Sequence, residues 1–145
     1  MNPKADIPQQ VAVAHALEDL LLDFFMGLDT FAFDGLANCL AEDGEWHRQG
    51  KVLRGRAMVL DAMAERGRDV RTAHVVTNFQ VTGTGGATAR ARFYLVGYRY
   101  DGPVTEGVPA PMQPPFSVGL YDCRFAMTGD GWKIASLSGS PRFKR

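Results

Sequence analysis

Two residues of this sequence, His74 and Asp29, have side chains suited to acid–base chemistry. His74 lies in the uncharged segment 72–78, which is rich in β-branched residues. A histidine in such surroundings titrates near neutral pH and could take a proton from a bound molecule. A histidine that makes only structural hydrogen bonds is the simpler explanation, and on the residue alone we favour it.

Asp29 directly follows the apolar run Phe25-Met26-Gly27-Leu28, at the predicted end of a long helix. A carboxylate in this position faces the unfavourable end of the helix dipole. An active site can retain a residue at such a cost, although a turn-forming aspartate before Thr30 would explain it too. Periodicity does not show whether Asp29 and His74 meet.

Three helices are predicted to position these residues, over about 9–28, 33–40 and 56–66. Apolar residues in them recur at three- and four-residue spacing, which is typical of helices that lie on a core. The segment 41–44 is expected to end the second helix, before a short strand at 45–48. The stretch 50–55 is expected to form a turn that leads to the third helix.

The second half of the chain is predicted to form strands at 72–82, 87–100, 117–128 and 132–138. Glycine-containing turns at 83–86 and 128–131 predict two hairpins. Helices followed by an antiparallel meander indicate an α+β fold, with the helices on one face of a curved sheet. The connection 101–116 holds five of the eight prolines and cannot be a central strand, so we expect a lid or a subunit contact.

The composition restricts the classes of function. With 145 residues, the chain fits a single domain over 1–145. Lys plus Arg equal Asp plus Glu at 16 each, which argues against binding to nucleic acid or to an anionic membrane. No apolar stretch is long enough to span a membrane, residues 1–10 do not resemble a signal peptide, and Cys39 and Cys123 are interpreted as buried free thiols. We therefore expect a cytoplasmic protein.

The sequence contains no motif for metal binding, nucleotide binding or covalent catalysis. The three histidines form no spaced cluster with Cys or Glu, and no glycine-rich loop follows a strand as a phosphate loop would. No serine lies in a nucleophile-elbow pattern. We expect no metal and no cofactor.

The predicted strand at 45–48 supplies two candidate residues of a ligand pocket. If the bulky Trp46 points inward, strand alternation places Arg48 inward and His47 outward. Arg48 would then favour a carboxylate, enolate or phenolate on the ligand. The alternative is an arginine in solvent or paired with Glu45.

The long strand at 87–100 presents different residues on its two faces. Phe93 and Leu95 share one face and are candidates for the apolar pocket wall. The other face would carry a row of large side chains that a monomer leaves exposed, which predicts a homodimer or higher homo-oligomer. This row consists of Tyr94, Val96, Tyr98 and Tyr100.

Several runs of the sequence resemble the SnoaL-like branch of the nuclear transport factor 2-like superfamily. They are Met26-Gly27-Leu28-Asp29, Asp34-Gly35-Leu36, Glu42-Asp43-Gly44-Glu45-Trp46, the run 71–78 (Arg-Thr-Ala-His-Val-Val-Thr-Asn) and Gly131-Trp132-Lys133-Ile134. The resemblance covers about 11–137. It implies a cone-shaped α+β barrel with three N-terminal helices in the concavity of a mostly antiparallel sheet.

The resemblance also implies a reaction. Scytalone dehydratase and hexachlorocyclohexane dehydrochlorinase, the enzymes most similar in pattern, pair an aspartate with a histidine at the positions of Asp29 and His74. A neutral His74 oriented by Asp29 would remove a proton from a small, mainly apolar, cyclic or aromatic substrate, as a cofactor-independent lyase or isomerase. Asn78, which ends the motif, is a further candidate for substrate contact.

One departure from the dehydratase pattern concerns its second histidine, which the segment 93–100 lacks. Tyr94, Tyr98 or Arg99 could take the role of the acid. The alternative function is a non-catalytic small-molecule-binding domain, or a supporting subunit like the small subunit of ring-hydroxylating oxygenases. Fold alone does not decide between them.

Overall fold

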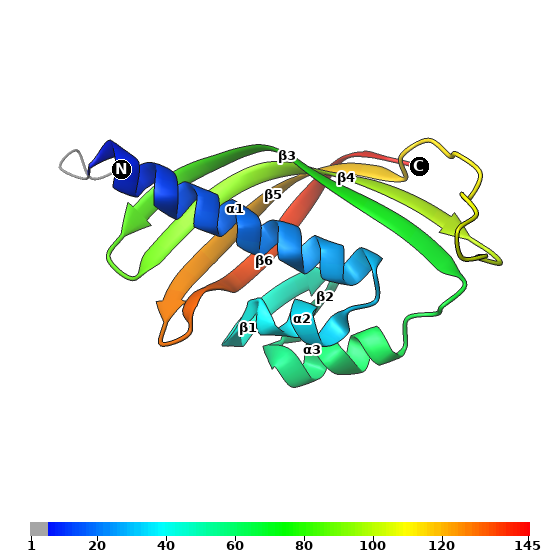
Figure 1. Ribbon diagram of the computed structural model, residues 1–145, viewed down its shortest axis with the longest axis horizontal. Helices are drawn as coiled ribbons and strands as arrows, with labels where there is room; N and C mark the ends of the chain where they lie inside the picture. Colours follow the sequence, from blue (N-terminus) through cyan, green and yellow to red (C-terminus); the bar gives the residue numbers. More distant parts are fainter. Residues whose placement is uncertain (1–5) are drawn as a thin grey trace.

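A computed structural model describes residues 6–145, which form three helices and one six-stranded sheet (Figure 1). The sheet order is β2-β1-β6-β5-β4-β3, and every neighbouring pair is antiparallel except β1 and β6. The predicted α+β fold is confirmed. The helices are α1 (Ile7–Asp29), α2 (Phe33–Asn38) and α3 (Gly55–Ala64), and the strands are β1 (Leu40–Arg48), β2 (Lys51–Arg54), β3 (Val70–Gly85), β4 (Thr88–Asp101), β5 (Ser117–Thr128) and β6 (Gly131–Lys144).

Helix α1 lies along the concave face of the sheet (Figure 1). Leu17, Leu21 and Phe24 are fully buried against the strands, as their helical spacing predicts. The helix ends at Asp29 because Phe31 adopts a positive φ of 60°. Thr30 stabilises this end, since both its backbone N–H and its hydroxyl donate to the carbonyl of Met26.

The segment 41–44 was expected to separate the second helix from the strand, but it belongs to β1, which begins at Leu40 instead of at 45. Gly44 is buried, and a Cβ there would lie 2.7 Å from the carbonyl oxygen of Ile134 on β6. The register between β1 and β6 also shifts in this region. This glycine therefore permits close approach of two strands at an irregularity and does not mark a turn.

A second strand, β2, was not predicted. It pairs with the end of β1 through a two-residue turn formed by Gln49 and Gly50, with φ of 52° and 75°. Positive φ at both positions is typical of tight hairpins. The turn was missed because glutamine is not a residue that signals such a conformation.

The two predicted hairpins are present, and β3 and β6 are longer than expected. β3 and β4 connect through Gly86 at a φ of 58°, and β5 and β6 connect through Gly131 at 98°. β6 continues to Lys144 instead of ending at 138. The extension of β6 carries this strand past the end of α1 (Figure 1).

The side chains on the inner face of β4 change from apolar and buried to small or charged along the strand. Ala89, Ala91 and Phe93 are buried in the main core. Further along the same face lie Gly97, which lacks a side chain, and Arg99, which is charged. One face of one strand therefore passes from the core to the open end of the sheet.

The proline-rich connection between β4 and β5 contains no helix or strand. Arg71 on β3 holds it by donating to the carbonyl oxygens of Val108, at 2.6 Å, and of Thr105, at 3.3 Å. At its end, the ring of Phe116 packs on Gly97, where a Cβ would lie 2.5 Å from a ring carbon. The loop thus reaches the inner side of the sheet at its open end.

Both cysteines are buried free thiols, as predicted. Burial raises the pKa of Cys39 to about 11, which keeps this thiol protonated and unreactive. Among residues 6–145, no helix is long and apolar enough to cross a membrane. Tyr94, Val96, Tyr98 and Tyr100 lie half-buried on the other face of β4, and an oligomer through this face stays a prediction.

Candidate active site

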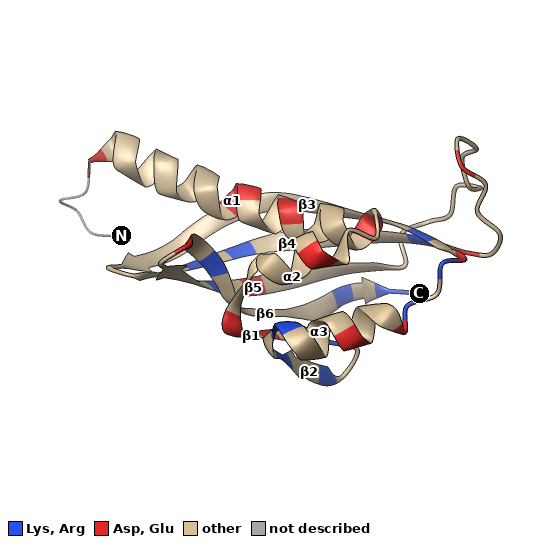
Figure 2. Cartoon of the chain, turned by 60° about the horizontal axis from the view of Figure 1, so that its bottom comes forward, with Lys and Arg blue, Asp and Glu red and all other residues tan. Residues whose placement is uncertain are grey.

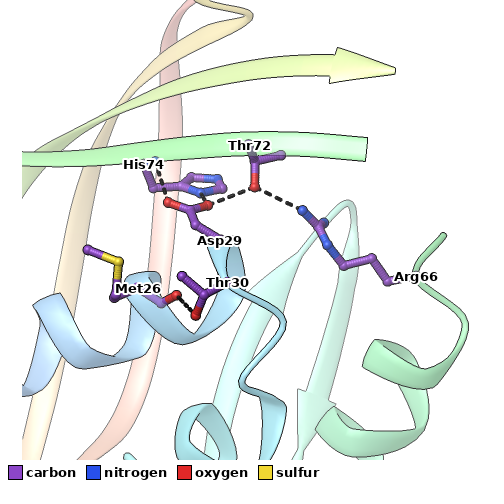
Figure 3. Close-up of polar contacts among 6 residues, drawn as sticks. All are labelled: Met26, Asp29, Thr30, Arg66, Thr72 and His74. Atoms are coloured by element: carbon purple, nitrogen blue, oxygen red, sulfur yellow. Dashed lines mark hydrogen bonds and ion pairs between the residues drawn. The ribbon is translucent and has the colours of Figure 1, made fainter. Parts of the chain in front are cut away.

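Asp29 and His74 are in direct contact (Figure 3). Oδ1 of Asp29 lies 2.6 Å from Nδ1 of His74, and the two side chains are only 14% and 10% exposed. The expected hydrogen bond between the end of the first helix and the start of a long strand is therefore present. It joins residues 45 positions apart in the sequence.

Two further hydrogen bonds hold the Asp29 carboxylate in place. The backbone N–H of His74 donates to Oδ2 at 2.8 Å, and the hydroxyl of Thr72 donates to Oδ1 at 2.7 Å. Nη2 of Arg66 donates in turn to the Thr72 hydroxyl at 3.0 Å. These contacts replace the water that a carboxylate loses on burial, and they offset its position at the negative end of α1.

The same contacts set the charge state of Asp29. Burial alone would raise the pKa of its carboxyl group, but hydrogen bonds from His74 and Thr72, with the charge of His74, outweigh burial and lower the pKa below 3.8. Asp29 is therefore ionised at neutral pH. An ionised carboxylate at Nδ1 keeps the proton of a neutral imidazole on that nitrogen.

This pKa shift predicts how the stability depends on pH. The unfolded chain binds a proton at Asp29 more readily than the folded chain does, so the stabilisation is present above pH 3.8 and is lost as the pH falls through the lower folded pKa. We expect the difference in unfolding free energy between wild type and Asp29→Asn to shrink over that acid range. Urea denaturation at several pH values measures it, and a difference independent of pH would contradict the assignment.

His74 lines a cavity of about 550 Å³, and its Nε2 bonds to no group of residues 6–145. The ring of Phe25 stacks on the imidazole at a centroid distance of 5.5 Å and an angle of 29°. With Nδ1 bound to Asp29 and one ring face covered by Phe25, the imidazole has one fixed orientation. Its free nitrogen can therefore accept a proton from a molecule in the cavity.

Three of the predicted pocket residues, Trp46, Arg48 and Leu95, line this cavity. The guanidinium of Arg48 lies over the indole of Trp46, 5.2 Å from the ring centroid. Glu45 pairs instead with Arg54, at 2.7 Å, and with His47, at 3.2 Å. The inward position of Arg48 thus fits the geometry better than pairing with Glu45.

Phe93 and Asn78 do not line the cavity. Phe93 is fully buried behind its walls, between the rings of Phe25 and Tyr121, so its influence is indirect. Asn78 is exposed at a φ of 56°, where the pairing of β3 and β4 shifts register. This irregularity breaks the strand alternation and places Asn78 away from His74.

Sequence reasoning did not identify Arg66 and Tyr121 as cavity residues. Arg66 follows α3, where a basic residue is ordinary, and only the folded chain brings it to Thr72. Tyr121 packs flat against glycines of two strands: a Cβ at Gly139 would lie 2.6 Å from its ring, and one at Gly119 would lie 2.8 Å away. Gly119 lies two positions before Tyr121 on β5, and Gly139 is its partner on β6. Glycines in such positions leave room for an aromatic ring and are a signal that could have found it.

Tyr121 is also the best-placed candidate acid. Tyr94 and Tyr98, which were considered for this role, do not line the cavity, and Arg99 is bound to Asp101. Burial raises the pKa of Tyr121, so its phenol stays protonated at neutral pH and can donate a hydrogen bond.

A larger and more open groove of about 1240 Å³ lies between the N-terminal half of α1 and the β3–β4 hairpin. It contains neither Asp29 nor His74, and its one histidine, His15, is exposed and pairs with Asp19 at 3.3 Å. We place the site at the smaller cavity, because a buried, oriented base is a stronger indication of chemistry than volume. No cluster of three metal-binding side chains occurs within residues 6–145.

Comparisons with known proteins agree with this fold. Hexachlorocyclohexane dehydrochlorinase LinA-type3 from Novosphingobium barchaimii LL02 is 19% identical with a TM-score of 0.74, over 95% of this chain and 92% of its own. A protein described as a candidate scytalone dehydratase, from Novosphingobium aromaticivorans DSM 12444, is 17% identical with a TM-score of 0.75, over 95% and 89%. An NTF2-like protein with a cystatin-like fold from Novosphingobium aromaticivorans is 22% identical with a TM-score of 0.69, over 96% and 92%.

At these identities, the likeness to solved structures shows the fold alone. No curated protein sequence matches this chain. The sequence pattern of the SnoaL-like domain matches residues 9–138, which is most of the chain and includes both Asp29 and His74. The chain belongs to the SnoaL-like domain family.

Proposed function

We propose that the protein is a cofactor-independent lyase that removes a proton from a carbon atom of a small organic substrate. The observation that carries the proposal is the orientation of His74. Its Nδ1 is bound to an ionised Asp29, its Nε2 has no partner among residues 6–145, and the residue lines the cavity. This is the arrangement that a general base needs.

The proposed reaction is an elimination. Nε2 of His74 takes the proton, and the electron pair of the broken C–H bond forms a carbon–carbon double bond. A group on the adjacent carbon leaves with its own bonding electron pair. Asp29 stabilises the imidazolium that forms, and Tyr121 can donate a hydrogen bond to the departing group.

The cavity suits a small cyclic or aromatic compound. Its volume of about 550 Å³ lies within the usual range for small-molecule sites. Apolar and aromatic side chains form much of its wall, and the base lies among them, where little water competes for the proton. These walls comprise Phe25, Leu28, Trp46, Leu95, Phe116 and Tyr121.

An assay for elimination tests the proposal. We expect wild type to release the leaving group from at least one member of a panel of cyclic β-halo and β-hydroxy carbonyl compounds, with a new double bond seen by ultraviolet absorption. His74→Gln should lose this activity because it removes the base. His15→Gln, a change of the exposed histidine on α1, should retain it.

If His74→Gln retained full turnover, His74 would not be the base. If wild type bound compounds in the cavity without turnover, the protein would be a non-catalytic binding domain. The names of two structural neighbours, a dehydrochlorinase and a candidate dehydratase, describe eliminations and support testing this class first.

A further inference from the structure

The cavity beside His74 is positively charged. Four of its lining residues are Lys or Arg, and none of the lining residues that the structure describes is Asp or Glu. The whole chain is neutral, with 16 basic and 16 acidic residues, so this local excess does not follow from composition. Figure 2 shows the acidic residues of α1 in the C-terminal half of the helix and basic segments near the C-terminal end of β6. The four cations are Arg48, Arg66, Arg99 and Lys144.

These four cations differ in how far they are neutralised. Arg99 forms hydrogen bonds of 2.9 and 3.0 Å with the carboxylate of Asp101. Lys144 is exposed near the end of the chain, where water solvates it. Arg48 and Arg66 are the two that are half-buried without an ion pair to any residue within 6–145.

Arg48 has only the indole of Trp46 as a described partner. Burial lowers the pKa of its guanidinium, and the nearby charge of Arg99 lowers it further. Both effects disfavour the charged form, yet guanidinium groups stay protonated in proteins. An anion at this position would relieve both costs.

Arg66 has unused hydrogen-bonding capacity. Its Nη2 donates to Thr72, but its Nε is buried and has no partner among residues 6–145 (Figure 3). A buried donor without a partner is unusual in folded proteins. Arg66 lines the same cavity as Arg48 and Arg99. Burial lowers the pKa of Arg66, and the charges of Arg48 and Arg99 lower it further.

We propose that Arg48 and Arg66 form a carboxylate-binding subsite of this cavity. The planar donor fork of a guanidinium matches the two oxygens of a carboxylate. The apolar part of the ligand would lie against Phe25, Leu95 and Tyr121, next to Nε2 of His74. The inference deepens the proposed function by naming an apolar carboxylic acid as the substrate class, but binding does not require turnover.

A pair of matched probes tests the subsite. Isothermal titration calorimetry should show that wild type binds 2-naphthoate at least about tenfold more tightly than the neutral 2-naphthamide, since charge-assisted hydrogen bonds are the stronger ones. Arg48→Gln should reduce the affinity for 2-naphthoate by about tenfold and leave that for 2-naphthamide unchanged. Equal binding of the two probes by wild type, or no binding of 2-naphthoate, would overturn the subsite.

Two control variants separate this proposal from others. Arg92→Gln, a change of an exposed arginine on β4, should bind 2-naphthoate like wild type. His74→Gln should also retain 2-naphthoate affinity, because the proposed subsite uses the arginines. An inactive wild type that still prefers 2-naphthoate would therefore reject the lyase and retain the subsite. An active enzyme that binds both probes equally would retain the lyase and reject the subsite.

The role of Arg66 needs a second readout, because this residue also supports Thr72. Arg66→Gln should weaken 2-naphthoate binding about tenfold, as Arg48→Gln does. Arg66→Lys keeps the charge but loses the planar fork, so it should recover only part of the affinity. Full affinity in both Arg66 variants would remove Arg66 from the subsite.

Discussion

Asp29→Asn is expected to lower kcat/KM of the elimination reaction by about a hundredfold or more. In the wild-type protein, one carboxylate accepts hydrogen bonds from the ring and the backbone N–H of His74 and from Thr72. An asparagine has a single acceptor oxygen for these three donors. If its NH₂ group faces Nδ1, the ring proton moves to Nε2, and His74 can no longer act as a base.

Loss of the charge adds to this effect, because an asparagine does not stabilise the imidazolium that forms when the substrate is deprotonated. We expect the loss in kcat rather than in substrate binding, since Asp29 does not line the cavity. Steady-state kinetics over a range of pH would separate the two.

Asp23→Asn is the matched control, because Asp23 is exposed on the same helix and should tolerate the change. If Asp29→Asn kept wild-type turnover and lost only thermal stability, the Asp29–His74 pair would be structural. The cavity would then remain a binding site without a catalytic base.

Phe24→Ala is expected to destabilise the fold by about 3–5 kcal/mol. Phe24 is fully buried and contacts two aromatic rings edge-on, Phe25 at 5.1 Å and Trp46 at 5.0 Å between centroids. Removal of the Phe24 ring would leave a void between α1 and β1. It would also loosen the packing of Phe25 and Trp46, which line the cavity. Urea-induced unfolding measures the loss of free energy.

Met26→Ala is the control for this change, because Met26 lies on the same helix with a side chain that is 63% exposed. Its effect on the unfolding free energy should stay within about 0.5 kcal/mol. Similar losses for the two variants would mean that α1 does not contribute its buried face to the core as described.

The sequence was most informative where one physical rule dominates. Helical spacing of apolar residues located α1, and glycine turns located both long hairpins, because these signals depend on neighbours along the chain. Asp29 and His74 were selected by residue type and by resemblance to a family. Their contact depends on how α1 crosses β3, which no local pattern encodes.

The errors occurred at residues whose structural role depends on a contact between segments that are distant in the sequence. Gly44 was interpreted as part of a segment that ends the second helix, but it lies buried in β1 against Ile134 on β6. Arg66 was not singled out, since its unpartnered Nε becomes apparent only after α3 and β3 are brought together. Asn78 was misplaced because a register shift within β3 cannot be deduced from alternation.

The inner face of β4 passes from buried apolar residues to residues that line the cavity. This arrangement determines which of its positions can be substituted without disturbing the core. Ala89, Ala91 and Phe93 are constrained by folding, since substitutions there disturb the closely packed interior. Gly97 and Arg99 lie beyond that interior, where a new side chain would enter the cavity or contact Phe116. Substitutions near the end of the strand can therefore alter ligand preference while the packing that maintains the fold is inherited unchanged.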